Sequence, residues 1–230
     1  MPRSAEPAMR ARTGRLRRML DVALSGLALL LLSPILLMLA VLVGWADGRP
    51  VLHRDARLGL NERPFEQLKF RTLAIGSGNG SSVAAEDDER IVRCGAWLRR
   101  WRLDELPQLL NVLAGQMSLV GPRPIQPSHA DALTPMQREI LFSVPPGLVD
   151  PVAGDFLAED EVLSGQAQPE NLYLQTILPA KASAQVAYLR TRSWLTDTAA
   201  VARMPFTLWS LKNRRRSARR LRRLLVNDSA

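Results

Sequence analysis

The stretch VALSGLALLLLSPILLMLAVLVGWA, residues 22–46, contains no charged side chain. Its 25 residues would form a straight helix of about 37 Å, which is long enough to cross a bilayer. A secretory signal peptide has a shorter apolar run, and a buried helix of a soluble protein normally keeps a polar face. The stretch therefore predicts a membrane helix attached to a more polar domain.

Two features of this stretch favour a re-entrant hairpin over a single span. Ser33-Pro34 lies near its middle, where proline removes a backbone donor and bends a helix. Arginines flank the stretch on both sides, and a single span would leave one basic cluster outside, against the positive-inside tendency. Because spanning helices tolerate one proline, the residues alone leave both topologies open.

The composition limits the kind of partner and the kind of metal site. The chain of 230 residues has a formal net charge of +9. This charge predicts anionic partners such as phosphorylated substrates, acidic lipids or nucleic acid, although a GC-rich genome also enriches arginine. Cys94 is the only cysteine and there are two histidines, which excludes an intrachain disulfide and leaves oxygen ligands for any metal.

The stretch WRLDELPQLLNVLAG, residues 101–115, places two acids before a stripe of leucines. We expect Asp104 to be the N-cap of a helix that ends at Gly115, and Glu105 to lie in its first turn. The helix dipole would then stabilise both carboxylates as anions and lower their pKa values, as suits a nucleophile or a metal ligand. A plain cap with an acidic first turn explains the same residues.

Two basic stretches suit phosphate groups. KFRT places Lys69 and Arg71 on one face of an extended segment, because side chains two residues apart point the same way. VGPRP holds Arg123 between two prolines in a pre-ordered loop, and guanidinium groups match phosphate oxygens. A solvated strand face and a rigid connector are the simpler alternatives.

The remaining segments carry ordinary signals of secondary structure. We expect extended pieces around a turn in residues 51–73, and a mobile loop in the Gly/Ser-rich and acidic residues 74–90. Thr134-Pro135 predicts a capped helix to about Phe142.

Two further predictions concern the C-terminal part. Residues 170–211 read as helical, with Pro179 and Pro205 as boundaries. The arginines at 214–223 could bind anionic lipid or nucleic acid, but a solvated tail is the simplest interpretation.

Taken in order, these stretches resemble the bacterial sugar transferases of the monotopic polyprenyl-phosphate phosphoglycosyl transferase group. The matching segments are LLSPILL, GRPVLHRDARLGLNERPFEQLKFRTL, RLDELPQLLNVLAGQMSLVGPRP and PPGLVDP. A later segment, ENLYLQTILPAKASAQVAYLRTRSWLTD, is similar to the C-terminal part of the exopolysaccharide-initiating branch. The resemblance covers about residues 17–206.

The resemblance implies an α+β, mostly helical fold. It would combine a re-entrant membrane helix hairpin, broken at Ser33 and Pro34, with a small cytoplasmic catalytic domain and interfacial amphipathic helices. The corresponding parts are a basic flank at 1–18, the membrane helix at 19–47, the catalytic domain at 48–211 and an Arg-rich tail at 212–230.

The family transfers a phosphosugar from a nucleoside diphosphate sugar, usually a UDP-sugar, to polyprenyl phosphate, releasing UMP and starting glycan or exopolysaccharide assembly. The resemblance implies that Asp104 is the nucleophile, which forms a covalent phosphosugar intermediate. It also implies that Glu105, together with Asp104, holds Mg²⁺, with Mn²⁺ as an alternative. We expect four basic residues to bind substrate phosphate: Lys69, Arg71, Arg102 and Arg123.

The resemblance also implies a location and partners. We expect the bacterial inner (cytoplasmic) membrane, with the catalytic domain facing the cytoplasm. The expected partners are polyprenyl phosphate, a UDP-sugar, anionic lipids of the inner membrane and downstream glycosyltransferases, with a homodimer as an open alternative and no nucleic acid.

One departure from the family pattern supports an alternative. Gln116 stands where the family usually has an aspartate close to the site. A catalytically degenerate membrane scaffold or regulator of polysaccharide biosynthesis would explain this loss, although the intact Asp104 and Glu105 argue against it. A basic RNA-binding protein is a third alternative, which the long apolar stretch disfavours. The identity of the sugar, the length of the lipid and the oligomeric state stay open.

Overall fold

The computed structural model describes residues 6–74, 91–92, 94–164, 166, 168–209, 215–221 and 223. Its helices, with η marking 3₁₀ or π turns, are α1 (Glu6–Asp47), η1 (Leu60–Glu62), α2 (Gly95–Arg100), η3 (Leu103–Glu105), α3 (Gln108–Ala114), η4 (Pro127–Ala132), α4 (Pro135–Leu141), η5 (Ala153–Phe156), α5 (Glu159–Leu163), α6 (Pro169–Leu172), η6 (Tyr173–Ile177), α7 (Leu178–Thr191) and α8 (Trp194–Trp209). The strands are β1 (Leu52–Leu58), β2 (Pro64–Phe70), β3 (Ser118–Val120) and β4 (Gly147–Val149). The protein is mostly helical with two small sheets, as predicted. The predicted loop lies, apart from its first residue, outside the described residues.

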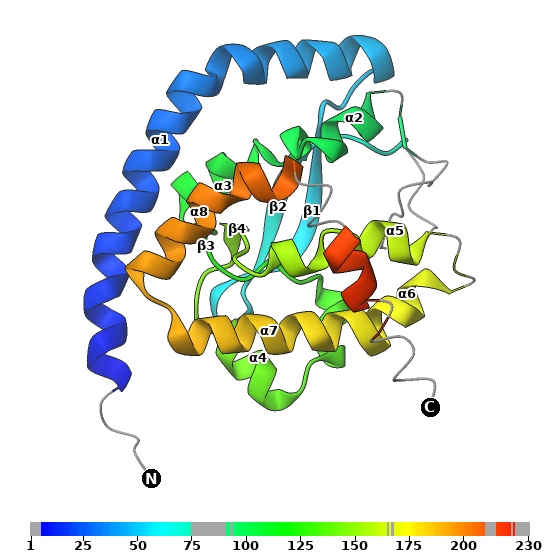
Figure 1. Ribbon diagram of the computed structural model, residues 1–230. Helices are drawn as coiled ribbons and strands as arrows, with labels where there is room; N and C mark the ends of the chain where they lie inside the picture. The colour runs from blue at the N-terminus through cyan, green and yellow to red at the C-terminus, as the bar shows by residue number, and fades with distance from the viewer. Residues whose placement is uncertain are drawn as a thin grey trace.

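The apolar stretch forms the second half of α1, a single helix of 42 residues. Pro34 lies inside this helix and cannot donate to the carbonyl of Leu30, but the hydroxyl of Ser33 donates to that carbonyl at 2.8 Å. Pro34 therefore does not interrupt α1, and the re-entrant path stays a prediction. Figure 1 shows that α1 bends as it passes along the outside of the domain and over the end where α2 lies.

Only one side of α1 is buried. Leu39 and Val43 pack with Phe70 of β2 and Leu98 of α2. Most of the other large apolar side chains are exposed, among them Leu24, Leu27, Leu30, Leu31, Leu37, Met38, Val41 and Trp45. By length and composition α1 could cross a membrane, which is weak evidence for membrane association.

The two sheets hold the loops that surround the acid pair. Strands β1 and β2 form an antiparallel hairpin, in agreement with the predicted extended pieces, and β3 and β4 pair in parallel. Gly147, the first residue of β4, lies very close to the residue that follows β3. A Cβ atom at position 147 would lie 2.1 Å from the nitrogen of Gly121. The nitrogen of Gly147 also donates to the carbonyl of Pro122 at 2.8 Å. These contacts fix the loop that carries Arg123.

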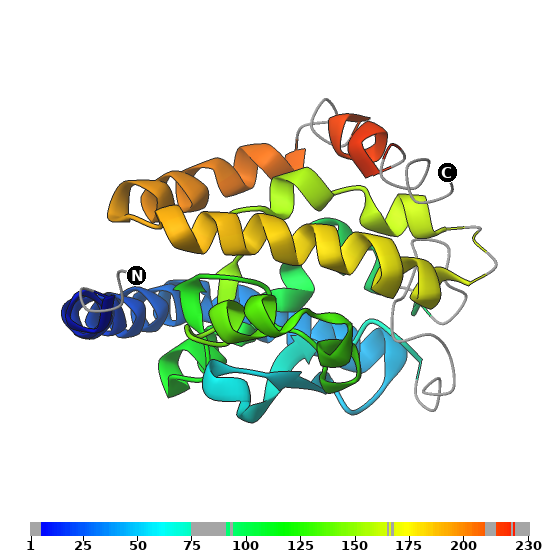
Figure 2. The same cartoon turned by 90° about the horizontal axis from the view of Figure 1, so that it is seen from below.

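The long C-terminal helices form a layer on one side of the domain, opposite the β1–β2 hairpin (Figure 2). Helix α4 begins with the predicted cap, in which Thr134 and Gln137 form a capping box. Pro179 lies in the first turn of α7, as predicted for a boundary. Pro205 does not end a helix but lies inside α8. The helical region is interrupted instead after Thr191, between α7 and α8.

Part of the Arg-rich tail is folded against the domain. Residues 215–221 are helical, and Ser217, Ala218 and Leu221 are buried in this helix. Leu221 packs with Phe156 of η5, and the hydroxyl of Ser217 donates to the carbonyl of Asp155 at 2.9 Å. The simplest interpretation, a solvated tail, is therefore wrong for this helix, because its apolar side completes a core cluster. Residues 212–214 and 224–230 lie outside the described residues.

Candidate active site

The acid pair lies in a tight turn and not at the start of a long helix. Arg102 adopts a left-handed conformation with φ 56°, which is uncommon for a residue with a side chain and frequent at functional sites. The chain then enters η3, which buries Asp104 and Glu105, and α3 begins only after Pro107. The predicted N-cap role of Asp104 is therefore wrong, since no side chain caps η3 or α3.

Glu105 is the anchor of two guanidinium groups. Its Oε1 atom accepts from Nη1 of Arg102 and from Nη2 of Arg123, both at 2.8 Å. Burial by itself would raise the pKa of Glu105, but the cations of Arg123, Arg102 and Lys69 outweigh it and hold this pKa well below its ordinary value. Glu105 is therefore ionised, as predicted.

Asp104 has the opposite electrostatic character. Its Oδ1 atom is buried and has no hydrogen-bond partner. Burial, followed by the neighbouring charge of Glu105, raises the pKa of Asp104, and Lys69 and Arg102 oppose this change only in part. The predicted lowering of its pKa is therefore wrong, because helix-end donors were expected to compensate for burial and are missing.

Lys69 joins the same cluster from β2. Its side chain is 17% exposed, and its Nζ atom lies 4.0 Å from Oδ2 of Asp55. Burial, together with the nearby cations of Arg57 and Arg123, lowers the pKa of Lys69 to about 8. Both acids of the pair are within its electrostatic reach. The strand therefore brings this predicted residue to the site.

Arg71 does not share that position. Its guanidinium group donates to the carbonyl of Gly48 at 2.8 Å and to the carbonyl of Asp47. These bonds tie the end of α1 to the segment after β2, so the predicted diphosphate-binding pair with Lys69 is not assembled. Ser33 and Pro34 lie within α1, where the hydroxyl of Ser33 donates to the carbonyl of Leu30.

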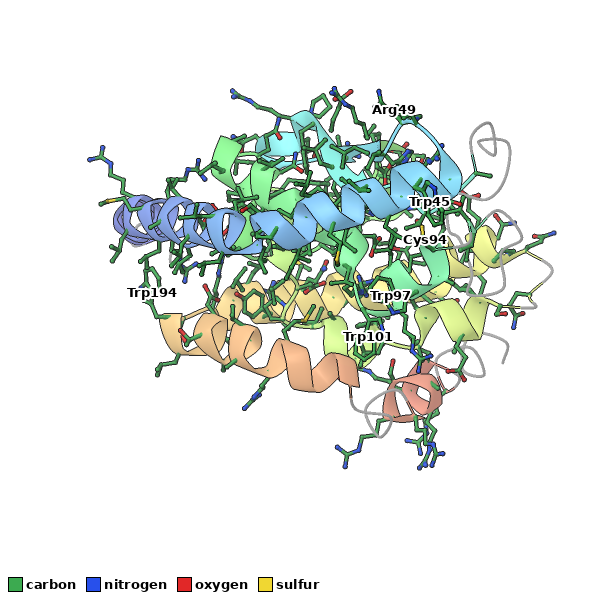
Figure 3. The ribbon with its side chains drawn as sticks, turned by 90° about the horizontal axis from the view of Figure 1, so that it is seen from above. Trp45, Arg49, Cys94, Trp97, Trp101 and Trp194 are labelled. Carbon is green, nitrogen blue, oxygen red and sulfur yellow. The ribbon has the colours of Figure 1, made fainter. Side chains whose placement is uncertain are left out.

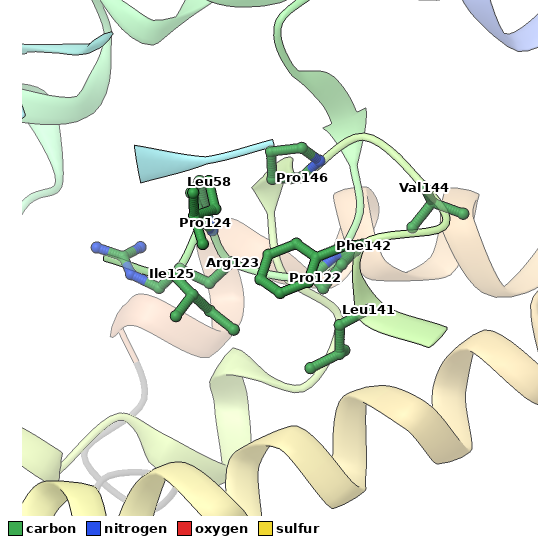
Figure 4. A pocket seen from close by; sticks show the side chains of 9 residues that line it. All are labelled: Leu58, Pro122, Arg123, Pro124, Ile125, Leu141, Phe142, Val144 and Pro146. Atoms are coloured by element: carbon green, nitrogen blue, oxygen red, sulfur yellow. The ribbon is translucent and has the colours of Figure 1, made fainter. Parts of the chain in front are cut away.

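The loop around Arg123 has an apolar inner side. A cavity of about 10 Å³ lies beneath it, large enough for at most one water, and is lined by Leu58, Phe142 and the loop prolines. Figure 4 shows the guanidinium group of Arg123 pointing away from this cavity. The prolines therefore face the core and Arg123 faces Glu105, as expected for a pre-ordered loop.

Sequence reasoning missed a second ion pair beside the first. Nζ of Lys181 on α7 lies 2.6 Å from Oε2 of Glu159 on α5, and both side chains are largely buried. Burial tends to raise the pKa of Glu159, but Lys181, Arg123 and Arg102 hold it below its ordinary value. The scarcity of lysine in an arginine-rich chain was the only sequence signal for Lys181.

The residues present fit a divalent cation only at a site where the substrate phosphates supply further ligands. Among the described residues no group of three or more His, Cys, Asp or Glu side chains could by itself hold a metal. Mg²⁺ commonly uses one or two carboxylates together with substrate phosphates and water. The unpartnered Oδ1 of Asp104 and the adjacent Glu105 fit such a shared site.

Gln116 lies at the opposite end of α3 from the acid pair. It follows Gly115, which ends α3, and its Oε1 atom accepts from Nδ2 of Asn111 at 2.7 Å. Asp104 and Glu105 precede the other end of the helix. The structure therefore places Gln116 beyond the far end of α3 and outside the turn that carries the acid pair.

Comparisons with known proteins identify the family of the chain. The family model described as bacterial sugar transferase matches residues 12–210. A Caulobacter vibrioides relative, named UDP-glucose:undecaprenyl-phosphate glucose-1-phosphate transferase, is 36% identical over 200 residues. That alignment covers 86% of this chain and 71% of the relative.

Two other relatives are longer and match over a smaller part. An Escherichia coli protein with the same name is 39% identical over 55% of this chain and 26% of its own length. An Aeromonas hydrophila protein, named UDP-N-acetylgalactosamine-undecaprenyl-phosphate N-acetylgalactosaminephosphotransferase, is 39% identical over 55% of this chain and 30% of its own length. This chain thus spans about a quarter of the length of several relatives, and their names contain two different sugars.

Proposed function

This chain belongs to the bacterial sugar transferase family, and on that premise we propose that it transfers a phosphosugar from a UDP-sugar to polyprenyl phosphate, releasing UMP. The observation that carries this proposal is the buried, unpartnered carboxylate oxygen of Asp104 beside the cations of Lys69, Arg102 and Arg123. A nucleophile needs a free lone pair, and a diphosphate needs positive charge around it. The product would start the assembly of a glycan or exopolysaccharide by downstream glycosyltransferases.

The reaction would proceed in two displacements at phosphorus. A carboxylate oxygen of Asp104 attacks the sugar-linked phosphorus, the bond to the bridging oxygen breaks, and UMP leaves with that oxygen. An oxygen of polyprenyl phosphate then attacks the phosphosugar-Asp104 intermediate, which frees the carboxylate and forms the polyprenyl-diphosphate sugar. Because burial raises the pKa of Asp104, the first step requires the proton to be lost before attack.

The other residues of the cluster would bind and orient the substrate. Arg123 and Arg102 are held by Glu105 at fixed positions, which lowers the entropy lost when they bind phosphate. Lys69 would add a third cation. When bound by Asp104 and Glu105, Mg²⁺ or Mn²⁺ would supply further neutralisation of the diphosphate charge.

We also propose that α1 enters and leaves the membrane on the same side. Asp21, before the apolar stretch, accepts hydrogen bonds from the hydroxyl of Ser118 at 2.8 Å and the nitrogen of Leu119 at 3.0 Å. Val43, near its end, packs with Phe70. Since both flanks contact one domain, which can lie on only one side of a bilayer, a re-entrant path is favoured over a span.

Exposed tryptophans support a location at the membrane surface. Trp45 near the end of α1 is 86% exposed, and Trp97 in α2 and Trp101 directly after it are close to half exposed. Figure 3 shows all three on the face crossed by α1. Tryptophan is enriched at headgroup level, so we propose that this face lies on the inner membrane, where anionic lipids attract the basic chain and the catalytic domain faces the cytoplasm.

The chemistry is tested by single-turnover UMP release. Incubated with UDP-sugar but without polyprenyl phosphate, the wild-type protein should release at most about one UMP per active site and retain phosphosugar on Asp104. Asp104→Asn should release none, and Asp131→Asn, at a carboxylate with 91% exposure, should behave like wild type. A burst of normal size from Asp104→Asn would refute the nucleophile assignment.

The topology is tested by cysteine labelling in sealed vesicles. Burial and a hydrogen bond to Asp47 raise the pKa of the native Cys94 to about 11, so it reacts slowly and new cysteines dominate. Arg15→Cys and Arg100→Cys should react with a membrane-impermeant maleimide from the same side. Labelling from opposite sides would exclude the re-entrant path.

The degenerate scaffold remains the competing function. Its motivation was Gln116, which lies away from the acid pair. UMP release from any UDP-sugar in a panel would reject the scaffold, and no release from the whole panel would favour it.

A further inference from the structure

Helix α8 covers a cavity of about 460 Å³ that none of the acid pair or its cations lines. Its walls come from α8, from Tyr188 of α7 and from the segment that begins with Asp150 after β4. Figure 2 shows α7 and α8 lying side by side along the same side of the domain. The volume is in the range of small-molecule sites, which is about 300–1,000 Å³.

The sequence of α8 explains why space remains there. Thr196, Ala200 and Arg203 line the cavity and are spaced by four and three residues, so they share one face of the helix. Ala199 lies beside them on the same wall. The two alanines leave space between the larger side chains of Leu195 and Met204, which also line the cavity.

The polar groups of the cavity are few and distinct. Arg203 forms no hydrogen bond or ion pair within the part of the chain that the structure describes. Asp150 is 5% exposed, and its carboxylate accepts from Nε2 of Gln185 at 2.7 Å and from the nitrogen of Val152 at 3.1 Å. The site thus offers one available cation and one oriented carboxylate between apolar walls, as is typical of pockets for uncharged, polar rings.

One face of α7 connects this cavity with the cluster at the acid pair. Lys181, Gln185 and Tyr188 follow one another at four and three residues. Lys181 pairs with Glu159 beside Arg123, Gln185 holds Asp150, and Tyr188 lines the cavity. Seven residues of helix rise by about 10 Å, so a ligand with an anionic end and an uncharged end could occupy both places.

We propose that this cavity binds the nucleoside portion of the nucleoside diphosphate sugar, while the diphosphate lies at Lys69, Arg102 and Arg123. This inference rests on the proposed function for the identity of the ligand. A polyprenyl chain is the other occupant that the reaction would offer. It would cover the exposed guanidinium group of Arg203 without offering a hydrogen bond in return, which is unfavourable.

The test fills the cavity and measures the binding of UMP to the full chain in nanodiscs by equilibrium dialysis. Ala200→Leu should weaken UMP binding by about ten-fold or more, because leucine occupies space that the nucleoside needs. The matched control is Ala202→Leu, at an exposed position of the same helix that does not line the cavity. This control should bind UMP like wild type.

A second variant covers the case in which leucine at position 200 disturbs the fold. Arg203→Gln keeps the helix and removes the available cation, and should weaken UMP binding several-fold, while Arg190→Gln at an exposed position of α7 should not. UMP affinity unchanged in Ala200→Leu and Arg203→Gln would overturn the proposal. An increased KM for polyprenyl phosphate with unchanged UMP affinity would also overturn it and assign the cavity to the lipid.

Because UMP binding needs no turnover, the result is separable from the transferase assay. A protein that binds UMP in this cavity and transfers no sugar would refute the proposed function alone. A protein that transfers sugar and binds UMP independently of Ala200 and Arg203 would refute this inference alone.

Discussion

The two ends of α3 both carry many polar contacts, but only one of them has an interaction left to make. At the first end, Asp104 is buried with an unpartnered oxygen next to Glu105 and its guanidinium groups. At the other end, Arg18 of α1 donates to the carbonyls of Val112 and Leu113 at 2.5 and 2.7 Å. The first end has the chemistry of a reaction site, and the second fastens α1 to the domain.

This difference explains why one departure from the family pattern matters less than the sequence suggests. Gln116 belongs to the second end, where its amide oxygen accepts from Asn111. An amide can replace a carboxylate as a hydrogen-bond acceptor there without changing the charge around Asp104. Four substitutions test whether the two ends of α3 have these different roles.

Glu105→Gln should have the largest effect, because it removes the charge that holds Arg102 and Arg123. We expect kcat/KM for UMP release to fall by roughly 10²–10³, the effect of losing a pre-organised electrostatic group. Glu66→Gln, at an exposed ion pair with Arg54, is the matched control and should stay within about two-fold. Near-normal turnover by Glu105→Gln would show that the first end is not part of the site.

Lys69→Arg should change the pH dependence. The pKa of Lys69 is lowered to about 8, so its cation is present below that pH and is lost as the pH rises through it. The wild-type kcat/KM should therefore decline above about pH 8, and in Lys69→Arg this decline should move to higher pH, because arginine stays charged.

The acid limb of the same profile reports on Asp104. Its raised pKa means that the carboxylate becomes protonated at a higher pH than an ordinary aspartate. As the pH is lowered, activity should therefore be lost before the pH reaches about 4, where an ordinary aspartate titrates. An alkaline limb that is identical in wild type and Lys69→Arg would contradict the role of Lys69.

Asp21→Ala should affect stability more than chemistry, because it removes an acceptor from Ser118 and Leu119 at the second end. Hydrogen bonds to a charged group contribute about 1.5–3 kcal/mol, which corresponds to a Tm lower by about 3–12 °C for a chain of this size. Thermal unfolding in detergent measures it, with the exposed Asp131→Ala as control. An unchanged Tm would mean that this contact does not hold α1.

Gln116→Asp should have the smallest effect. The restored acid would lie at the second end, so kcat/KM should remain within about three-fold of wild type. Parallel assays of UMP release measure this. A gain of ten-fold or more would show that Gln116 limits the reaction and would join the two ends into one functional unit.

The sequence predicted those parts of the fold that depend on neighbouring residues. The capped start of α4 at Thr134, the end of α3 at Gly115 and the strand hairpin all follow from local signals, and the structure contains them. The prediction for Pro205 failed because a proline removes one backbone donor from a helix, which the turns on either side of it can tolerate. The prediction for Arg71 failed because strand alternation gives the face of a residue but not the partner that lies there.

The sequence by itself determined that an apolar helix precedes a basic domain and that two acids stand next to each other beside arginines. The tertiary structure alone decided that Glu105 holds its charge firmly while Asp104 keeps an open oxygen. It also brought Glu159, Lys181 and the cavity under α8 toward the same cluster. The physical reason is that burial and charge pairing depend on residues far apart in the chain, which no local pattern records.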